Sequence, residues 1–214
     1  MLYLHSFYLH YYKKRQIVKL LRLAVCLLFI LPLNISAVEI LQTGQTLSYF
    51  PHDDGATRHG IEWDPDTRFI QNGDGTISDQ ATNLMWIKDG TCLPKGTWDE
   101  SIEEIENLND GSTGSQCQDF SADYDNWRFP NLFELMSLLS AEANIDNTDT
   151  FLQRNGFIGF DDFMLTSTPN SEDSSEVFCL VPAYGFQIQD CSRLATITNY
   201  TAVRTVSGFS TVLP

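Results

Sequence analysis

The feature that most constrains this chain is the stretch of residues 68–86, RFIQNGDGTISDQATNLMW. Its Asn-Gly and Asp-Gly dipeptides at residues 72–75 predict a tight turn, because glycine takes up positive φ angles without steric cost. Short runs with apolar or β-branched residues lie on both sides of that turn, and a further apolar run at residues 84–87 is typical of a buried strand. The stretch therefore predicts three consecutive antiparallel strands. It contains no nucleophile–base pair and no complete metal motif, so it indicates an architecture rather than a reaction.

The first 37 residues differ in composition from the rest of the chain. They contain five lysines and arginines, no acid, an apolar run at residues 23–33 and a small residue, Ala37, at a plausible cleavage position. This order is that of a secretory signal peptide. We therefore expect residues 1–37 to be removed on export to the periplasm, the cell surface or the medium. No stable membrane insertion is expected afterwards, since no other segment approaches the roughly 20 apolar residues of a spanning helix.

The remaining chain is strongly acidic. Cleavage after Ala37 would leave 177 residues, enough for one domain with a sizeable core. Its eight lysines and arginines stand against 28 aspartates and glutamates, a net charge of −20, compared with −15 for the whole chain. A surface of that charge repels nucleic acid, anionic lipid and sulfated polysaccharide at long range. The composition therefore argues against nucleic acid as a partner.

Four cysteines follow the predicted cleavage site, and an even number in an exported domain indicates disulfides. Three connectivities are open. We favour Cys92–Cys117 and Cys179–Cys191, because the second pair lies symmetrically about Gly185, as opposed positions on a hairpin do. Free thiols or a zinc site are the alternatives. Neither a Cys-x-x-Cys spacing nor a nearby histidine supports zinc.

Two amphipathic helices are expected after the three strands. Thr97 and Glu100 form a capping box, and apolar residues spaced three or four apart follow as far as Leu108. Asn131 and Glu134 begin a second helix of the same kind. The two sequences therefore predict helices that each bury one face, with carboxylates on the solvent face of the first.

The rest of the chain favours strands, at residues 163–168, 176–181, 186–191, 194–198 and 200–207. Strands, two helices and further strands predict a single α+β domain over residues 68–214. Residues 38–67 are expected to be a leading segment of that same domain, with a candidate edge strand at residues 47–50.

The ordered motifs of the chain resemble one known family. They are Asn72-Gly73-Asp74-Gly75-Thr76, Asp79-x-Ala81-Thr82-x-Leu84-Met85-Trp86, Trp98, Trp127-Arg128-x-Pro130-Asn131-x-x-Glu134-Leu135, Ser167-Thr168 and Val203-Arg204. This pattern is similar to the family named after the C-terminal domain of the Legionella collagen-like protein, a family of unknown function. The resemblance implies a C-type-lectin-like, formylglycine-generating-enzyme-like fold and an extracellular binding or adhesion role.

The namesake of the family binds sulfated polysaccharide, and two features of this chain differ from what that ligand implies. Leu165-Thr166-Ser167-Thr168 stands where members usually carry Trp-Ser-Ser-Thr. The net charge of −20 also has the wrong sign for a sulfated glycan, whose binding depends on clustered Lys and Arg. We therefore expect the fold of the family without its polyanionic ligand.

Candidate ligand-binding residues are few. Arg128 follows Trp127 and has two interpretations: a structural ion pair with one of the many acids, or a guanidinium that binds a ligand carboxylate. Trp63, Tyr124 and Tyr184 are the candidate aromatic residues on which a sugar ring would stack.

Calcium is the one candidate cofactor, at two places. Asp74 and Asp79 lie in a stretch that resembles a calcium loop, although Ile70 stands where such a loop needs its first carboxylate, and a hairpin turn explains the same residues. Glu172, Asp173 and Glu176 form an acidic loop, for which a solvated surface is the alternative interpretation.

These observations together predict an exported, non-enzymatic binding module for carbohydrate or another surface ligand, with no catalytic residue. His52 and His59 are the only histidines after residue 37, which leaves little material for a Ser-His-Asp or Cys-His site. One alternative is a structural or assembly protein of the envelope that binds a protein partner. The other is a hydrolase that uses two carboxylates.

Overall fold

The computed structural model of the chain divides into two units, residues 1–38 and residues 39–214. The residues that the structure describes all belong to the second unit, and the predicted signal peptide lies outside them. Within this described part, no helix combines the length and the apolar character needed to cross a membrane. The described residues are 40–110, 117, 120, 124–141, 148–160, 163–181, 187–196 and 200–206.

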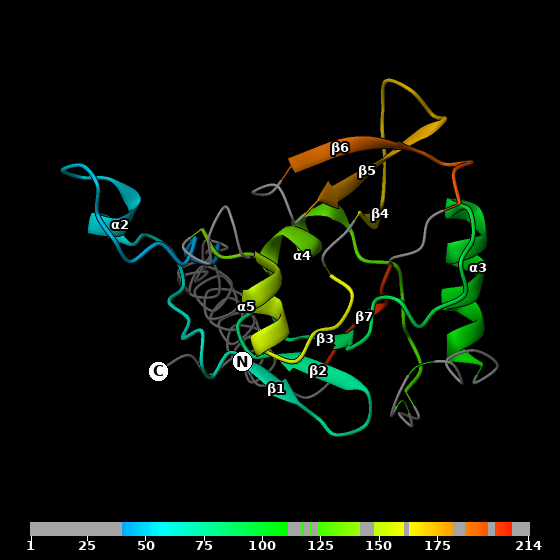
Figure 1. Ribbon diagram of the computed structural model, residues 1–214, viewed down its shortest axis with the longest axis horizontal. Coiled ribbons are helices and arrows are strands. Elements are labelled where there is room, and N and C mark those ends of the chain that lie inside the picture. The colour runs from blue at the N-terminus through cyan, green and yellow to red at the C-terminus, as the bar shows by residue number, and fades with distance from the viewer. Residues whose placement is uncertain are drawn as a thin grey trace, which may run out of the picture. The chain divides into compact units, whose positions relative to one another are not determined.

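The first sheet is built on the predicted hairpin (Figure 1). Strands β1 (Phe69–Gln71), β2 (Thr76–Asp79) and β3 (Leu84–Ile87) are antiparallel neighbours, as the sequence predicts. The amide of Asn72 donates to the carbonyl of Thr76 at 3.0 Å and closes the first turn. Gly75 has φ +84°, and a Cβ there would lie 2.6 Å from the Cα of Phe120. Glycine is therefore required at this position both for the turn and for the close packing above it.

The end of the domain returns to this sheet. Strand β7 (Val203–Thr205) pairs with β3, which gives the order β1-β2-β3-β7. Val203 has no exposed surface, so it faces the interior of the domain. The predicted strand at residues 194–198 is wrong for residues 194–196, which form a turn and coil. There Arg193 accepts from Trp98 and donates to Ser175 through its backbone, and these long-range bonds override the local alternation.

The second sheet consists of β4 (Met164–Pro169), β5 (Glu176–Val181) and β6 (Gln187–Ser192), also antiparallel. Both predicted disulfides are present. Cys179–Cys191 joins β5 to β6, and Cys92–Cys117 joins the chain before the helix at residues 98–109 to the chain after it. The fold is therefore the predicted α+β class with antiparallel sheets and two disulfides.

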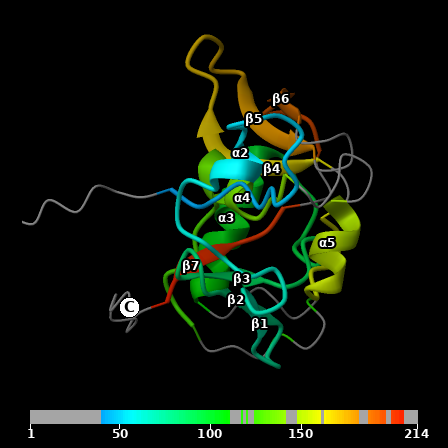
Figure 2. The same ribbon diagram turned by 90° about the vertical axis from the view of Figure 1, so that its left-hand side faces the viewer.

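Both predicted helices begin at their predicted caps. Helix α3 (Trp98–Asn109) starts at Thr97 and α4 (Leu132–Ser137) at Asn131, each with a complete capping box. In Figures 1 and 2, α4 lies between the two sheets, and it contacts both β4 and β5. The core forms two apolar clusters, one that includes the inner face of α3 and one that includes Trp86, α4 and α5.

The structure adds two short helices that the sequence patterns do not predict, α2 (Asp54–Thr57) and α5 (Thr148–Arg154). The predicted edge strand at residues 47–50 is wrong. Those residues pair with no strand and are exposed. The Asp53 carboxylate accepts from the amides of Tyr49 and Phe50 and caps α2 through Ala56, so a capped loop takes the place of a strand.

Candidate functional site

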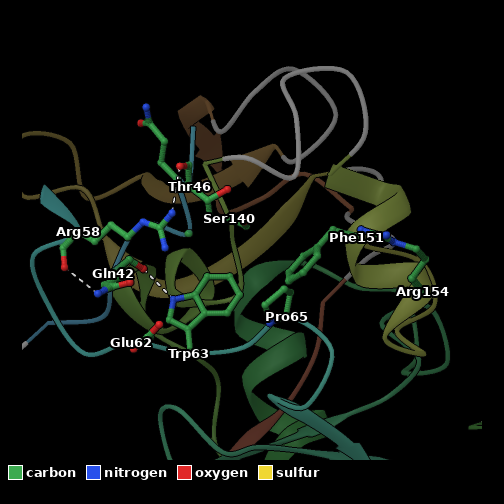
Figure 3. Close-up of a pocket in the computed structure, with 11 residues that line it drawn as sticks. Gln42, Thr46, Arg58, Glu62, Trp63, Pro65, Ser140, Phe151 and Arg154 are labelled. Atoms are coloured by element: carbon green, nitrogen blue, oxygen red, sulfur yellow. Dashed lines mark hydrogen bonds between the residues drawn. The ribbon is translucent and has the colours of Figure 1, made fainter. Parts of the chain in front are cut away.

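A pocket of about 180 Å³ lies where the leading segment meets α5 and the chain after α4 (Figure 3). Residues 42–65 supply most of its wall. Ser140 comes from the chain after α4, and Phe151 and Arg154 come from α5. The lining combines aromatic rings with charged and amide side chains: Gln42, Gly44, Gln45, Thr46, Arg58, Glu62, Trp63, Pro65, Ser140, Phe151 and Arg154.

Trp63 is the central aromatic residue of this pocket. Its indole Nε1 donates to the carbonyl of Gln42 at 2.8 Å, and its ring centroid lies 6.1 Å from that of Phe151. The guanidinium carbon of Arg68 lies 4.7 Å from the Trp63 ring centroid. The ring is half-buried and is held by three neighbours, so it forms a fixed apolar surface rather than a mobile side chain.

The backbone around Trp63 depends on Gly44. This residue has φ +81°, and a Cβ there would lie 2.5 Å from Ser140 Oγ and 2.7 Å from the Trp63 ring. Glycine alone lets the chain pass so close to both. The amide of Ala141 also donates to the carbonyl of Thr43 at 2.7 Å. The leading segment is thus joined to the chain after α4 at the pocket itself.

A buried ion pair supports Trp63 from behind. Arg68 donates to both carboxylate oxygens of Asp79 at 2.7 and 2.8 Å, and neither side chain has exposed surface. Arg68 also donates to the carbonyl of Ser137 and lies between the rings of Trp63 and Phe69. The pair therefore connects the first sheet, the end of α4 and the pocket.

Two arginines bring positive charge to the pocket. Arg58 follows α2 with φ +46°, and its guanidinium donates to the carbonyls of Thr46 at 3.1 Å and Gly55 at 3.4 Å. Arg154 lies exposed in the last turn of α5. Neither has an ion pair with a carboxylate among the described residues. Glu62 is the one carboxylate among the lining residues that the structure describes.

Of the three predicted ligand-binding residues that the structure describes, Trp63 alone lines this pocket. Arg128 makes a bidentate ion pair with Glu134, one bond of which is 2.7 Å, and this hydrogen bonding raises the pKa of the guanidinium. Tyr124 covers the guanidinium of Arg204 at 4.4 Å from ring centroid to carbon. Tyr184 lies outside the described residues. The structure thus shows the ion pair that the structural interpretation of Arg128 predicts.

The candidate calcium ligands are distributed over separate contacts. Asp79 accepts from Arg68, from the amide of Ala81 and from the hydroxyl of Thr82, so its carboxylate is engaged in the fold. Asp74 accepts from the amide and hydroxyl of Thr76, which is the hairpin interpretation of this loop.

The acidic loop before β5 has local contacts of its own. Asp173 accepts from the hydroxyl and amide of Ser175, and these bonds lower the pKa of its carboxyl. Glu172 is exposed there, and Glu176 begins β5. In the described part of the chain, no three His, Cys, Asp or Glu side chains come together as metal ligands. Calcium binding by these residues stays a prediction.

Sequence reasoning missed Arg58, Arg154 and Phe151 as pocket residues. Their convergence depends on how α2 and α5 are placed, and neither helix has an apolar periodicity long enough to predict. The sequence gives no signal for the two arginines, because whether an arginine has a carboxylate partner depends on contacts between segments far apart in the chain.

Comparison with known proteins gives one result. No curated protein and no solved structure matches the chain. The family described as the Lcl C-terminal domain matches residues 75–207, from the turn before β2 to just beyond β7. The matched segment includes Ser140, Phe151 and Arg154 of the pocket, whereas residues 42–65 precede it. The match spans more than half of the chain, which therefore belongs to the Lcl C-terminal domain family.

Proposed function

We propose that this protein is an exported, non-enzymatic binding module that holds a carbohydrate in the pocket around Trp63. The observation that carries the proposal is the fixed, half-buried indole of Trp63, next to Phe151 and surrounded by polar side chains. Sugars present an apolar ring face and a polar edge, so a site of this composition suits them. Ligand sites in general combine aromatic surface with a few placed polar groups.

The carboxylates of the pocket favour binding over hydrolysis. Glycoside hydrolases typically use two carboxyl groups on either side of the bond that is cleaved. Among the described residues, the lining contains a single carboxylate, Glu62, and no histidine. The two histidines of the described chain, His52 and His59, are exposed and outside the lining.

The compartment and the fold family belong to the same proposal. Two disulfides are typical of oxidising environments, which supports export. We infer that residues 1–37 are the signal peptide and that the remaining chain has a C-type-lectin-like fold. Short antiparallel strands in two sheets, two capped helices and two disulfides support that fold.

The proposal is tested by titrating the oxidised protein with neutral and acidic mono- and disaccharides and following both intrinsic fluorescence and saturation-transfer NMR. Trp63 should report binding, because Trp86 and Trp127 are buried in the core and Trp98 lies under Arg193. Trp63→Ala should reduce affinity at least tenfold, with Trp63→Phe intermediate. Tyr49→Ser, at an exposed aromatic residue outside the pocket, is the matched control and should bind as the parent does. Equal binding by the parent and by Trp63→Ala would reject the pocket as the site.

A protein partner is the second candidate, and the surface of the leading segment favours it. Leu47, Tyr49 and Phe50 expose 58%, 79% and 74% of their surface within four residues. Grouped exposed apolar side chains are typical of protein-binding surfaces. If no sugar binds and Tyr49→Ser with Phe50→Ser abolishes a defined interaction on the cell envelope, this candidate replaces the first.

A further inference from the structure

We propose that the pocket recognises a carboxylate carried on a sugar ring, as in a uronic acid, and that Arg58 binds this group while Arg154 adds positive charge at the other side. The inference rests on the proposed function and specifies the ligand of the same pocket. Its basis is how the chain uses its arginines.

The described residues include six arginines, and three of them have a carboxylate partner among those residues. Arg68, Arg128 and Arg193 make ion pairs with Asp79, Glu134 and Asp99. Arg204 is buried under Tyr124 and donates to Asn126. The remaining two, Arg58 and Arg154, both line the pocket. Among the described residues neither of these two arginines has a carboxylate partner, although acids outnumber bases 28 to 13 in this chain, so a ligand can supply the negative charge at this site.

Arg58 is held ready for such a group. Its Nε and one Nη donate to the backbone carbonyls of Gly55 and Thr46, which uses two of the five N–H bonds of the guanidinium. The others remain for a ligand, and the anchored side chain loses little entropy when it binds one. The guanidinium also matches the geometry of a carboxylate. Figure 3 shows Arg58 and Arg154 on opposite sides of the Trp63 and Phe151 rings, so each side of this aromatic surface has one positive charge.

The other polar groups suit the hydroxyls of a sugar. Ser140 is 5% exposed and lines the pocket, so its hydroxyl is placed to bond a ligand hydroxyl. Glu62 can accept from a ligand hydroxyl. A volume of about 180 Å³ is smaller than the pockets of drug-sized ligands and fits a single ring or the terminal residue of a longer glycan.

The same charges argue for one carboxylate rather than many anionic groups. At long range the chain as a whole, with net charge −15, repels a polyanion. At short range the described residues of the lining provide two guanidinium groups and one carboxylate. A ligand with one negative charge gains from the local pair of arginines without bringing many charges toward the acidic surface.

The test compares D-glucuronate and D-galacturonate with their methyl esters, which keep the ring and remove the charge. Binding to the oxidised chain is measured by NMR and fluorescence at low and moderate salt. The acid should bind at least tenfold tighter than the ester, and the difference should shrink as salt increases. Arg58→Gln should abolish the preference, and Arg154→Gln should reduce it severalfold. Glu62→Gln should tighten binding of the acid by removing a repulsion.

Lys95→Gln is the matched control, since Lys95 is an exposed base without an ion pair among the described residues and does not line the pocket. It should bind as the parent does, and an equal loss in this variant would overturn the proposal by showing a general charge effect. Melting curves show whether each variant is folded. Glu62→Gln tests the same electrostatic argument in the opposite direction, because this variant should bind the acid more tightly and not more weakly.

Equal affinity for acid and ester at a Trp63-dependent site would overturn the carboxylate inference and leave the proposed function standing. Binding of neither would overturn the carboxylate inference, and the titration with neutral sugars would then decide separately on the proposed function. Arg154 occupies the last turn of α5, where a cation also favours the helix dipole. An Arg154→Gln variant that melts earlier but keeps the full preference would therefore assign Arg154 to the helix end and remove it from the site.

Discussion

At the scale of single residues, Arg68 contacts several separate parts of the fold at once. It lies between the rings of Trp63 and Phe69, pairs with Asp79 and donates to Ser137, while one of its Nη atoms is buried without a partner. The aromatic faces offset that unpaired nitrogen, because a guanidinium is attracted to the electron-rich face of a ring. These polar partners hold the guanidinium in one position, which packing against apolar side chains alone would not do. Arg68 thus fixes the back of the pocket.

Replacing Arg68 with leucine should destabilise the protein by about 3–5 kcal/mol, because the Asp79 carboxylate would be left buried without its cation. Urea unfolding of the oxidised protein measures the loss. Arg193→Leu is the control. Its ion pair with Asp99 is partly exposed, and such pairs contribute about 1 kcal/mol or less. The double variant Arg68→Leu with Asp79→Leu should recover part of the stability. Similar losses for Arg68→Leu and Arg193→Leu would contradict the structural role of the buried pair.

The sequence predicts Trp63 as a binding residue but does not predict Arg58 and Arg154, which line the same pocket. An aromatic residue in a polar stretch is visible by its type alone. Arg58 and Arg154 become candidates because they line the pocket and have no carboxylate partner among the described residues. Both observations depend on contacts between segments far apart in the chain. Arg128 illustrates the opposite case, since its partner Glu134 lies six residues away on the next helix and is accessible to sequence reasoning.

At the scale of elements, the predictable parts are those with local chemistry. The hairpin of β1 and β2 follows from its glycines, and α3 and α4 follow from their capping boxes. The helices α2 and α5 have four and seven residues, too few for an apolar period to be recognised. At residues 47–50 the local pattern predicts a strand that the structure does not contain. The Asp53 carboxylate accepts from the backbone amides of Tyr49 and Phe50, which a strand would have used for pairing.

The capping box of α3 gives a prediction at this scale. Thr97→Ala should lower stability by about 1 kcal/mol, as is usual for loss of an N-cap side chain. The amide and hydroxyl of Thr97 lower the pKa of Glu100 below its ordinary 4.5. Ionised Glu100 therefore contributes stability above the unfolded-state pKa, and this contribution is lost as the pH falls through the lower folded-state value.

Thermal melting from neutral pH to below pH 4.5 measures this effect. The parent should lose more stability on acidification than Glu100→Gln, whose capping contact does not titrate. Glu103→Gln, at an exposed glutamate of the same helix, should keep the acid sensitivity of the parent. Parallel curves for the parent and Glu100→Gln would show that the capping box does not contribute to the acid dependence.

At the scale of the whole molecule, the segment that the family match covers and the pocket coincide only in part. Residues 75–207 supply both sheets apart from β1, both disulfides, α3, α4 and α5. Residues 42–65 supply most of the pocket wall and precede the match. The framework is thus the family's, while the proposed specificity depends largely on a segment outside the match.

The charge of the whole molecule provides the last prediction, on the polyanionic ligand that the family resemblance implies. With 28 acids against 13 bases, the protein should not be retained on immobilised heparin at about 0.15 M salt, where the Debye length is about 8 Å. At that range only contacts within the pocket survive screening, and two arginines are too few to hold a chain of sulfates against the surrounding acidic surface. Retention on an anion exchanger under the same conditions shows that the surface is accessible and acidic. Retention on heparin that Arg58→Gln with Arg154→Gln abolishes would contradict this argument, because the pocket would then be strong enough to override the net charge and to accept a polyanion.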